Sequence, residues 1–301
     1  MFMQKKIDRL GSVNSKNRIL REMISSTELS FLMEAHNGLS AKIAQNSGFS
    51  GLWASGLTIS ASLGLSDRNE ASWTQVLDVA EFMADHVDIP ILLDGDTGFG
   101  SYLNVMRLVK KLCQKGISGV CLEDKVFPKM NSFIGEKQEL IAIEDFCSKI
   151  KAAKDTQLDD DFVLVARTEA LISGRGMAEA LRRAEAYHEA GADAILIHSK
   201  KTDASEIVEF SNEWAERSPL VIVPTKYYST PTELYRDLKI STVIWANHSL
   251  RASVVAIENT TKKIFETQSI KEVEQDIVSL QDLFLLTNEV NSAIAEKKYG
   301  L

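Results

Sequence analysis

Eight short apolar segments recur along the chain, and their alternation with helical patterns constrains the fold more than any other feature. The segments are residues 31–35, 51–54, 90–93, 119–122, 162–166, 194–198, 220–224 and 242–246. Amphipathic helical patterns lie between most of them, at residues 71–86, 102–115, 142–153, 176–190 and 204–216. Eight such units without a break in composition predict an α/β protein, a closed TIM-type (β/α)8 barrel rather than an open sheet.

The sequence after the eighth unit exceeds what a barrel needs. Residues 251–267 are followed by two further helical patterns, at 270–286 and 288–298. We therefore expect a single domain over residues 1–301, with a barrel core at 24–250 and extra C-terminal helices at 251–301. Because an amphipathic helix must cover its apolar face, these helices are expected to pack on a neighbouring subunit or on the flank of the barrel.

The composition argues against several classes of partner. The 301 residues carry a formal net charge of −8, which argues against nucleic acid and against an anionic membrane. Cys113, Cys121 and Cys147 show no C-x-x-C spacing, so neither a disulfide framework nor a zinc cluster is predicted. Residues 1–21 have mixed charge, and no segment reaches the length of a signal-peptide core or a membrane span. We expect a cytoplasmic protein.

Polar residues follow every one of the eight apolar segments, at 34–38, 53–57, 94–98, 123–125, 167–169, 198–200, 225–228 and 247–251. In (β/α)8 enzymes the catalytic side chains come from the C-terminal ends of the strands, so this pattern predicts an active site at that end. Residues 123–132 combine two acids, two lysines, an amide and a proline. This segment is expected either to bring a metal-organising acid beside an anion site or to be an ordinary solvated turn.

Four acids near the strand ends form an all-oxygen set. Asp94 and Asp96 are two residues apart, and an extended backbone would direct both side chains to one face. Glu123 follows the adjacent strand, and Asp67 lies in the loop after the second strand. Carboxylates without cysteine or paired histidines suit Mg²⁺ or Mn²⁺. The alternative is that Asp94 and Asp96 cap the following helix.

Other residues at the strand ends could bind an anion. Arg167 offers a planar fork for a carboxylate or phosphate, although an ion pair with Glu169 is an alternative. Residues 55–57, Ser-Gly-Leu, could form a backbone anion cradle. His198 could donate to a substrate or cap a strand, and Trp53 is more typical of barrel filling. The sequence contains neither a nucleotide-binding P-loop nor a dinucleotide fingerprint.

Longer motifs extend from these strand ends. They read EAHNGLSA (34–41), WASGL (53–57), LLDGDTG (92–98), EDKVFPKMNS (123–132), VAR (165–167), AGADA (190–194), HSKK (198–201), PTKYY (224–228) and IWANH (244–248). In this order they resemble the phosphoenolpyruvate phosphomutases, within the phosphonopyruvate-handling branch of the isocitrate lyase and phosphoenolpyruvate mutase superfamily. The resemblance runs from about residue 28 to residue 281. Gly95, where alanine is usual, and residues 133–139 depart from the family pattern.

The resemblance implies a Mg²⁺-dependent barrel that interconverts phosphoenolpyruvate and phosphonopyruvate, the step that forms the carbon–phosphorus bond in phosphonate biosynthesis. It implies that Asp94 binds the metal directly and that Asp67, Asp96 and Glu123 hold metal-bound waters. It also implies a homotetramer or homodimer in which C-terminal helices are exchanged between subunits.

The same resemblance assigns roles to individual residues. Lys129 and Asn131 would lie on a gating loop, and Arg167 and His198 would contact the enolate or phosphoryl portion. The catalytic set is then Asp67, Lys129, Asn131, Arg167 and His198. The substrate-binding set is Trp53, Ser55, Gly56 and Leu57, with the backbone N–H groups of Ser55 and Gly56 binding the substrate carboxylate.

Three alternatives share this barrel. A phosphonopyruvate hydrolase would carry a smaller hydroxyl residue near the loop lysine, whereas this chain has Asn131. A carbon–carbon lyase of the isocitrate lyase type would carry a catalytic cysteine, and residues 125–132 contain none. A non-catalytic scaffold would be expected to have lost the metal acids, which are all present here.

Overall fold

The computed structural model describes residues 15–134, 138–287 and 289–300. Three expectations lie wholly or partly outside the described residues. They concern the mixed-charge N-terminus at 1–14, the centre of the divergent segment 133–139, and the first residue of the helix expected at 288–298.

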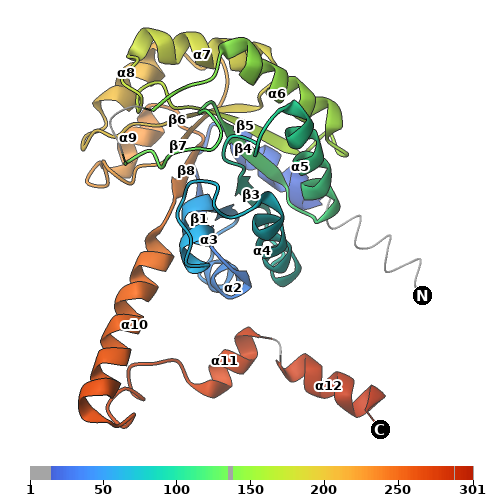
Figure 1. The fold of residues 1–301 in the computed structure, drawn as a ribbon, viewed down its shortest axis with the longest axis vertical. Helices are drawn as coiled ribbons and strands as arrows, with labels where there is room; N and C mark the ends of the chain where they lie inside the picture. Colours follow the sequence, from blue (N-terminus) through green and yellow to red (C-terminus); the bar gives the residue numbers. More distant parts are fainter. Residues whose placement is uncertain (1–14, 135–137, 288, 301) are drawn as a thin grey trace.

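Eight parallel strands form a closed barrel in sequence order, with β1 paired to β8 (Figure 1). The strands are β1 Ser30–Ala35, β2 Leu52–Ala54, β3 Ile91–Asp94, β4 Gly119–Glu123, β5 Val163–Thr168, β6 Ala194–Ile197, β7 Leu220–Ile222 and β8 Thr242–Trp245. Each lies within two residues of a predicted segment. The predicted (β/α)8 barrel is therefore confirmed.

Helices alternate with the strands and surround the barrel (Figure 1). They are α2 Gly38–Asn46, α3 Gly56–Ser62, α4 Trp73–His86, α5 Tyr102–Gln114, α6 Ile143–Thr156, α7 Met177–Glu189, α8 Ser205–Trp214 and α9 Thr232–Asp237. The helical patterns predicted between the strands correspond to α4 through α8. The shorter helices α2, α3 and α9 were not among the predicted patterns.

Two apolar clusters fill the structure. The inner one takes at least one side chain from each strand, among them Leu32, Trp53, Leu92, Cys121, Val165, Leu196, Val221 and Ile244. The helix at residues 15–25 adds Leu20 and Ile24 to this cluster. The outer cluster lies between strands and helices. Because side chains fill the barrel itself, a ligand site is left only at its end.

The strand register brings three of the predicted site residues to the same rim. Asp94 pairs with Cys121, and Glu123 pairs with Arg167 two positions further along β4. Asp94, Glu123 and Arg167 belong to their strands rather than to the loops that follow, so the hydrogen-bonded ladder fixes their backbones.

The C-terminal helices are α10 His248–Thr267, α11 Leu280–Leu286 and α12 Glu289–Tyr299. Helix α10 extends away from the barrel (Figure 1), whereas the end of α11 returns to it, where His86 Nε2 on α4 donates to Leu286 O at 2.9 Å. The helix predicted at 270–286 is wrong in its first half, because residues 271–276 form turns. A new helix starts only at Leu280, where the Ser279 hydroxyl accepts the Asp282 N–H at 3.1 Å and caps α11. Within the described residues, no helix has both the length and the apolar character to cross a bilayer.

Candidate active site

Three of the predicted acids meet at the ends of β3 and β4. The carboxylates of Asp94 and Asp96 both lie against Gly56. A Cβ atom added to this glycine would be 3.0 Å from Asp96 Oδ1 and 3.2 Å from Asp94 Oδ2. The prediction that an extended backbone aligns them is wrong, because Asp96 has a left-handed φ of 50°. They do not cap the next helix either, since Ser101 is the N-cap of α5. Glu123, the last residue of β4, is 2% exposed.

The segment after β4, residues 125–134, folds over these acids, and we call it the β4 loop. Lys129 Nζ forms ion pairs with Asp67 Oδ1 at 2.7 Å and with Asp96. Asn131 Nδ2 donates to Asp67 Oδ2 at 2.6 Å. The side chains of Lys129 and Asp67 are only 7% and 9% exposed. The expectation of an ordinary solvated turn therefore fails, and Lys129, Asn131 and Asp67 lie together.

The crowded acids perturb one another. Burial raises the pKa of Asp96, Lys129 opposes this shift, and Asp94, Asp67 and Glu123 add repulsion, so that the pKa reaches about 8. Burial would also raise the pKa of Asp67, but Lys129, Asn131 and Arg167 together outweigh burial and lower it. Burial would lower the pKa of Lys129, and the surrounding acids raise it well above its usual range. Lys129 is thus cationic, yet one lysine cannot keep every acid ionised at neutral pH.

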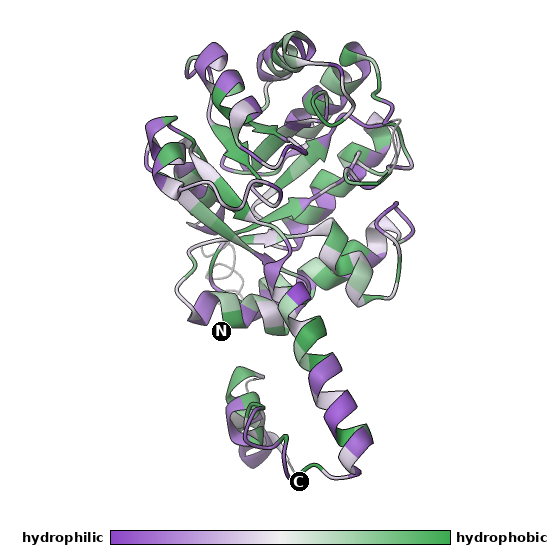
Figure 2. Cartoon of the chain, turned by 90° about the vertical axis from the view of Figure 1, so that its left-hand side faces the viewer, coloured by the Kyte–Doolittle hydropathy of each residue, from purple (hydrophilic) through white to green (hydrophobic). Residues whose placement is uncertain are grey.

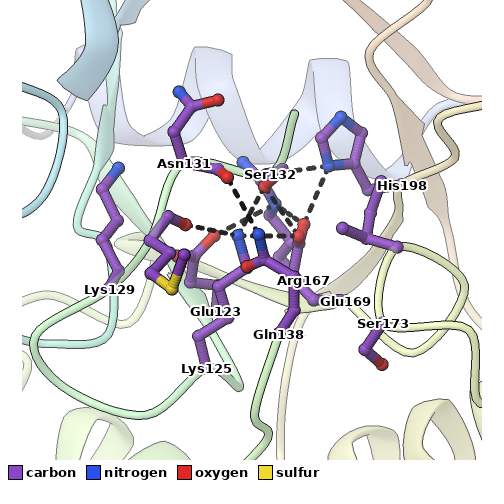
Figure 3. A network of polar contacts seen from close by, with 12 residues as sticks. Glu123, Lys125, Lys129, Asn131, Ser132, Gln138, Arg167, Glu169, Ser173 and His198 are labelled. Carbon is purple, nitrogen blue, oxygen red and sulfur yellow. Dashed lines mark hydrogen bonds and ion pairs between the residues drawn. The ribbon is translucent and has the colours of Figure 1, made fainter. Parts of the chain in front are cut away.

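A second polar network joins the β4 loop to β5 and β6 (Figure 3). Ser132 Oγ accepts from Lys125 Nζ at 2.6 Å and from Arg167 Nη2 at 3.0 Å, and it donates to Glu169 Oε2 at 2.7 Å. Glu169 Oε1 contacts Arg167 Nε at 2.5 Å and His198 Nδ1 at 2.8 Å. The ion pair offered as an alternative role for Arg167 exists, but its partner carboxylate is shared by a whole cluster.

The charges in this network fix the protonation of its members. Burial would raise the pKa of Glu169, but Arg167, His198 and Lys125 outweigh it and place the pKa well below its usual range. Burial, with Arg167 beside it, lowers the pKa of His198, so the imidazole is neutral at pH 7. Arg167 Nε also lies 3.3 Å from Glu123 Oε2. Arg167 therefore connects this network to the acid cluster.

A small cavity of about 60 Å³ lies between the two networks. Its walls include Trp53, Ser55, Leu57, Asp67, Asp94, Glu123, Lys129, Asn131, Arg167 and His198. Trp53 belongs to the inner apolar cluster as well, so it both fills the barrel and forms part of the cavity wall. Phe133 of the β4 loop packs edge-on against His198, with ring centroids 5.4 Å apart. The β4 loop therefore forms one wall of the cavity.

The expected backbone cradle is already engaged by the protein. Ser55 N–H donates to Ala35 O at 3.3 Å, and Gly56 N–H donates to Asp94 Oδ2 at 3.2 Å. A ligand carboxylate would have to replace these acceptors. Leu57 also lines the cavity, on the first turn of α3.

The residues present fit a divalent cation held mainly through water. Among the described residues, no three His, Cys, Asp or Glu side chains converge closely enough to ligate one ion. Mg²⁺ commonly takes only one or two carboxylates and keeps several waters. The buried Glu123 Oε1 has no hydrogen-bond partner. With all five carboxyl groups ionised, Asp67, Asp94, Asp96, Glu123 and Glu169 would exceed the three bases Lys125, Lys129 and Arg167 by two charges, which a divalent cation would balance.

Comparison with known proteins places this arrangement in a family. A sequence profile described as phosphoenolpyruvate phosphomutase matches residues 20–265. The chain belongs to this family. A phosphoenolpyruvate phosphomutase from Tetrahymena pyriformis is 55% identical over 289 residues, which cover 96% of this chain and 96% of that protein.

Solved structures of phosphoenolpyruvate phosphomutase relatives share the whole fold. The crystal structure of a phosphoenolpyruvate phosphomutase from Streptomyces platensis subsp. rosaceus is 41% identical, with a TM-score of 0.91 over 94% of this chain and 99% of that one. A phosphonopyruvate hydrolase crystallised with oxalate and Mg²⁺ is 40% identical, with a TM-score of 0.89 over 94% of this chain and 99% of that one.

Asn69 and Ser132 were not assigned a role from the sequence, and Glu169 was considered only as an ion-pair partner of Arg167. Asn69 contacts Asp96 and the β4 loop, Ser132 joins the loop to Arg167, and Glu169 holds Arg167 and His198. Glu169 could have been found, because it lies two residues after Arg167, where a strand directs side chains to the same face. Asn69 and Ser132 lie in loops whose folding the pattern of apolar residues does not determine.

Proposed function

We propose that this protein interconverts phosphoenolpyruvate and phosphonopyruvate. The observation that carries the proposal is the β4 loop, which seats Lys129 and Asn131 over the acid cluster and buries the cavity between them. The loop has no cysteine at residues 125–134, which argues against a lyase that needs one. Membership of the phosphoenolpyruvate phosphomutase family supports the same reaction.

The acid cluster is proposed to hold Mg²⁺, with Mn²⁺ as a substitute. Asp94 would be the direct ligand, and Asp67, Asp96 and Glu123 would hold its waters. When bound, the ion would supply positive charge that stabilises the pyruvate enolate. The free Glu123 Oε1 and the raised pKa of Asp96 support this assignment, because both describe acids that lack sufficient positive charge.

The remaining cavity residues are proposed to hold the two halves of the substrate. The reaction breaks the bond from phosphorus to the enol oxygen and forms the bond from phosphorus to the methylene carbon, with no proton or water consumed. Arg167 would contact the phosphoryl or enolate oxygens, and the ring of His198, whose Nδ1 contacts Glu169, would contact the same portion of the substrate. Asn131 and Lys129 would stabilise the migrating phosphoryl group from the β4 loop.

Water exclusion decides the product. A phosphoryl group that meets water gives phosphate and pyruvate, which is hydrolysis of the same substrate. Phe133 and the buried Ser132 place loop side chains over the cavity. Trp53 and Leu57 add apolar walls, and Ser55 and Gly56 would bind the substrate carboxylate once their present acceptors are replaced.

Phosphorus NMR of the protein with phosphonopyruvate and Mg²⁺ tests the proposal. We expect a phosphoenolpyruvate signal to appear; a phosphate signal alone would make the protein a hydrolase, and an unchanged spectrum would refute both activities. Asp94→Ala should abolish turnover, whereas Asp88→Ala, an exposed aspartate at the other end of β3, should leave it unchanged. Asn131→Ala should lower turnover about a hundredfold or more, as removal of one transition-state donor does.

We also propose that the C-terminal helices pair subunits as a homodimer or homotetramer in which these helices are exchanged. No side chain of α10 is buried over its 20 residues, although the helix carries apolar residues along its length (Figure 2). Phe265 on α10 and Phe82 on α4 are 84% and 71% exposed. A second copy of the chain would cover such surfaces.

Light scattering of the purified full chain measures the assembly. We expect a dimer or tetramer, and Phe265→Glu should shift it towards monomer. A monomeric wild-type chain at micromolar concentration would refute the exchange. A cytoplasmic location is proposed as well, and the absence of any disulfide among Cys113, Cys121 and Cys147 supports it.

A further inference from the structure

Asn69 joins the acid cluster to the β4 loop with one side chain. It lies between α3 and α4, two residues after Asp67. Its Nδ2 donates to Asp96 Oδ2 at 2.7 Å, and its Oδ1 accepts the backbone N–H of Lys129 at 2.8 Å. Both polar ends of the amide are thus used, one on each side of the boundary between barrel rim and loop.

The backbone around Asn69 is arranged to present this amide. Asn69 has a left-handed φ of 58°, a conformation that asparagine tolerates better than most residues do. One residue later, Glu70 Oε2 accepts the N–H of Ser66 at 2.8 Å and closes the turn. The turn therefore fixes the backbone of Asn69, and the side chain is held by its hydrogen bonds to Asp96 and to the Lys129 N–H.

The contact differs in kind from the other links between the loop and the acids. Lys129 and Asn131 reach Asp67 and Asp96 through their side chains, using carboxylate oxygens that a divalent cation and its waters would also need. Asn69 is neutral, and it holds the loop by the Lys129 backbone. This hydrogen bond uses no carboxylate oxygen, so a cation bound to the acids would not compete for it.

We infer that Asn69 is a positioning residue that keeps the β4 loop closed and orients Asp96. This inference deepens the proposed function. Its statement about products rests on that function, because a loop held closed by Asn69 would direct the phosphoryl group to carbon rather than to water. The loop contact itself does not depend on which reaction the site performs.

Two substitutions separate the two ends of the amide. Asn69→Gly keeps the left-handed backbone and removes both hydrogen bonds. Asn69→Asp keeps an oxygen for the Lys129 N–H but loses the donor to Asp96 and adds a negative charge beside it. Asn46→Gly is the matched control. Asn46 is exposed and is the last residue of α2, so it lies at the end of the barrel opposite the candidate site.

Trypsin reports on the closed loop without any need for activity. Cleavage after Lys129, identified by mass spectrometry, requires the buried lysine to leave the acids. We expect Asn69→Gly to speed this cleavage about tenfold, since the hydrogen bond that holds the Lys129 backbone is lost. Asn69→Asp and the Asn46→Gly control should remain within about threefold of wild type. Thermal melts in parallel show whether each variant is folded.

Phosphorus NMR of the same variants with phosphonopyruvate and Mg²⁺ provides the second readout. In Asn69→Gly the ratio of phosphate to phosphoenolpyruvate should rise at least about fivefold, and Asn69→Asp should lose turnover without that rise. Wild-type cleavage rates in a folded Asn69→Gly would overturn the inference, and equally fast cleavage in Asn69→Asp would remove the role of Oδ1. If the wild type converts no phosphonopyruvate, the proposed function fails while the protease result still decides the loop contact.

Discussion

Glu123 and Asp124 are adjacent acids at the end of β4, and they have opposite environments. Glu123 faces the cavity, and its Oε1 has no hydrogen-bond partner although the side chain is buried. Asp124 points to the outside of the barrel, where α7 covers it. The alternation of side chains along an extended strand separates the two.

Asp124 is fully engaged by four donors. Its Oδ1 accepts Glu169 N–H at 2.9 Å. Its Oδ2 accepts from Tyr187 Oη at 2.7 Å, from Arg183 Nη1 at 3.1 Å and from Thr168 Oγ1 at 3.3 Å. Asp124 itself is 0% exposed. This carboxylate therefore ties the end of β4 to β5 and α7.

The difference between Glu123 and Asp124 shows how hydrogen-bond partners distinguish an acid that stabilises the fold from one that serves a ligand site. A buried acid whose hydrogen bonds are all made serves the fold, because its desolvation is compensated within the protein. A buried acid that keeps an unpartnered oxygen beside other acids is destabilising alone, so its presence indicates a partner from outside the chain. Glu123 is of the second kind.

Glu123→Gln should give the largest effect on activity. The amide keeps the size of the side chain but removes the charge that the proposed cation needs, so kcat should fall about a thousandfold, within the range for loss of one electrostatic contact. The free energy of unfolding should change by less than about 1 kcal/mol, because two opposite effects nearly cancel. The substitution removes the repulsion between Glu123 and the other acids, and it also removes the ion pair between Glu123 and Arg167. Steady-state kinetics and urea titration measure the two quantities. Activity within tenfold of wild type would contradict the assignment.

Asp124→Asn should show the reverse pattern. Removing the charge leaves Arg183 buried beside an amide, and breaking a buried ion pair costs about 3 kcal/mol or more in unfolding free energy. At a temperature where the variant is folded, kcat should stay within about threefold of wild type, since no cavity-lining group is removed. A folded variant with normal stability and a large loss of kcat would reverse the comparison between the two acids.

Mg²⁺ should raise the free energy of unfolding, and this gain should depend on Glu123 but not on Asp124. At about one hundred times its dissociation constant, a ligand that binds only the folded state adds about 2.7 kcal/mol to the free energy of unfolding. Wild type and Asp124→Asn should gain this increment in urea titrations, EDTA should remove it, and Glu123→Gln should gain clearly less. Equal gains in all three proteins would exclude Glu123 from the cation site.

The fold could be predicted from the sequence because each strand is a short apolar run and each run ends in polar residues. The strand ends were placed within two residues, so Asp94, Glu123 and Arg167 were located correctly at one rim. The turn at Asp96 was not foreseen, because its left-handed backbone is imposed by tertiary contacts. The helix expected at 270–286 failed because a capping serine, and not apolar periodicity, determines where α11 begins.

The partners of the site residues were harder to predict than the residues themselves. Asp124 depends on Arg183 and Tyr187, which are 59 and 63 positions away in the sequence. Asn69 meets Asp96 across 27 positions and Lys129 across 60. Loop and helix side chains reach such partners only after the barrel has closed, and nothing in local spacing identifies them.

Tyr187→Phe should give the smallest effect and the sharpest test of the role of Asp124. Burial raises the pKa of Tyr187, so its hydroxyl stays protonated and donates to Asp124 throughout the working pH range. The substitution keeps the ring against Phe146, with centroids 4.6 Å apart, and removes two hydrogen bonds, the one donated to Asp124 and the one accepted from Arg183 Nη1 at 2.9 Å. Unfolding should therefore become easier by about 2 kcal/mol with kcat unchanged.

Tyr228→Phe is the control for this substitution, since Tyr228 is 80% exposed and should show no change. Because Tyr187 and Asp124 belong to one network, the double variant with Asp124→Asn should lose less stability than the sum of the two single variants. Additive losses would mean that the hydroxyl acts elsewhere, and Asp124 would then be held by Arg183, the Thr168 hydroxyl and the Glu169 N–H. A fall in kcat without a fall in stability would place Tyr187, and with it Asp124, in the chemistry rather than in the fold.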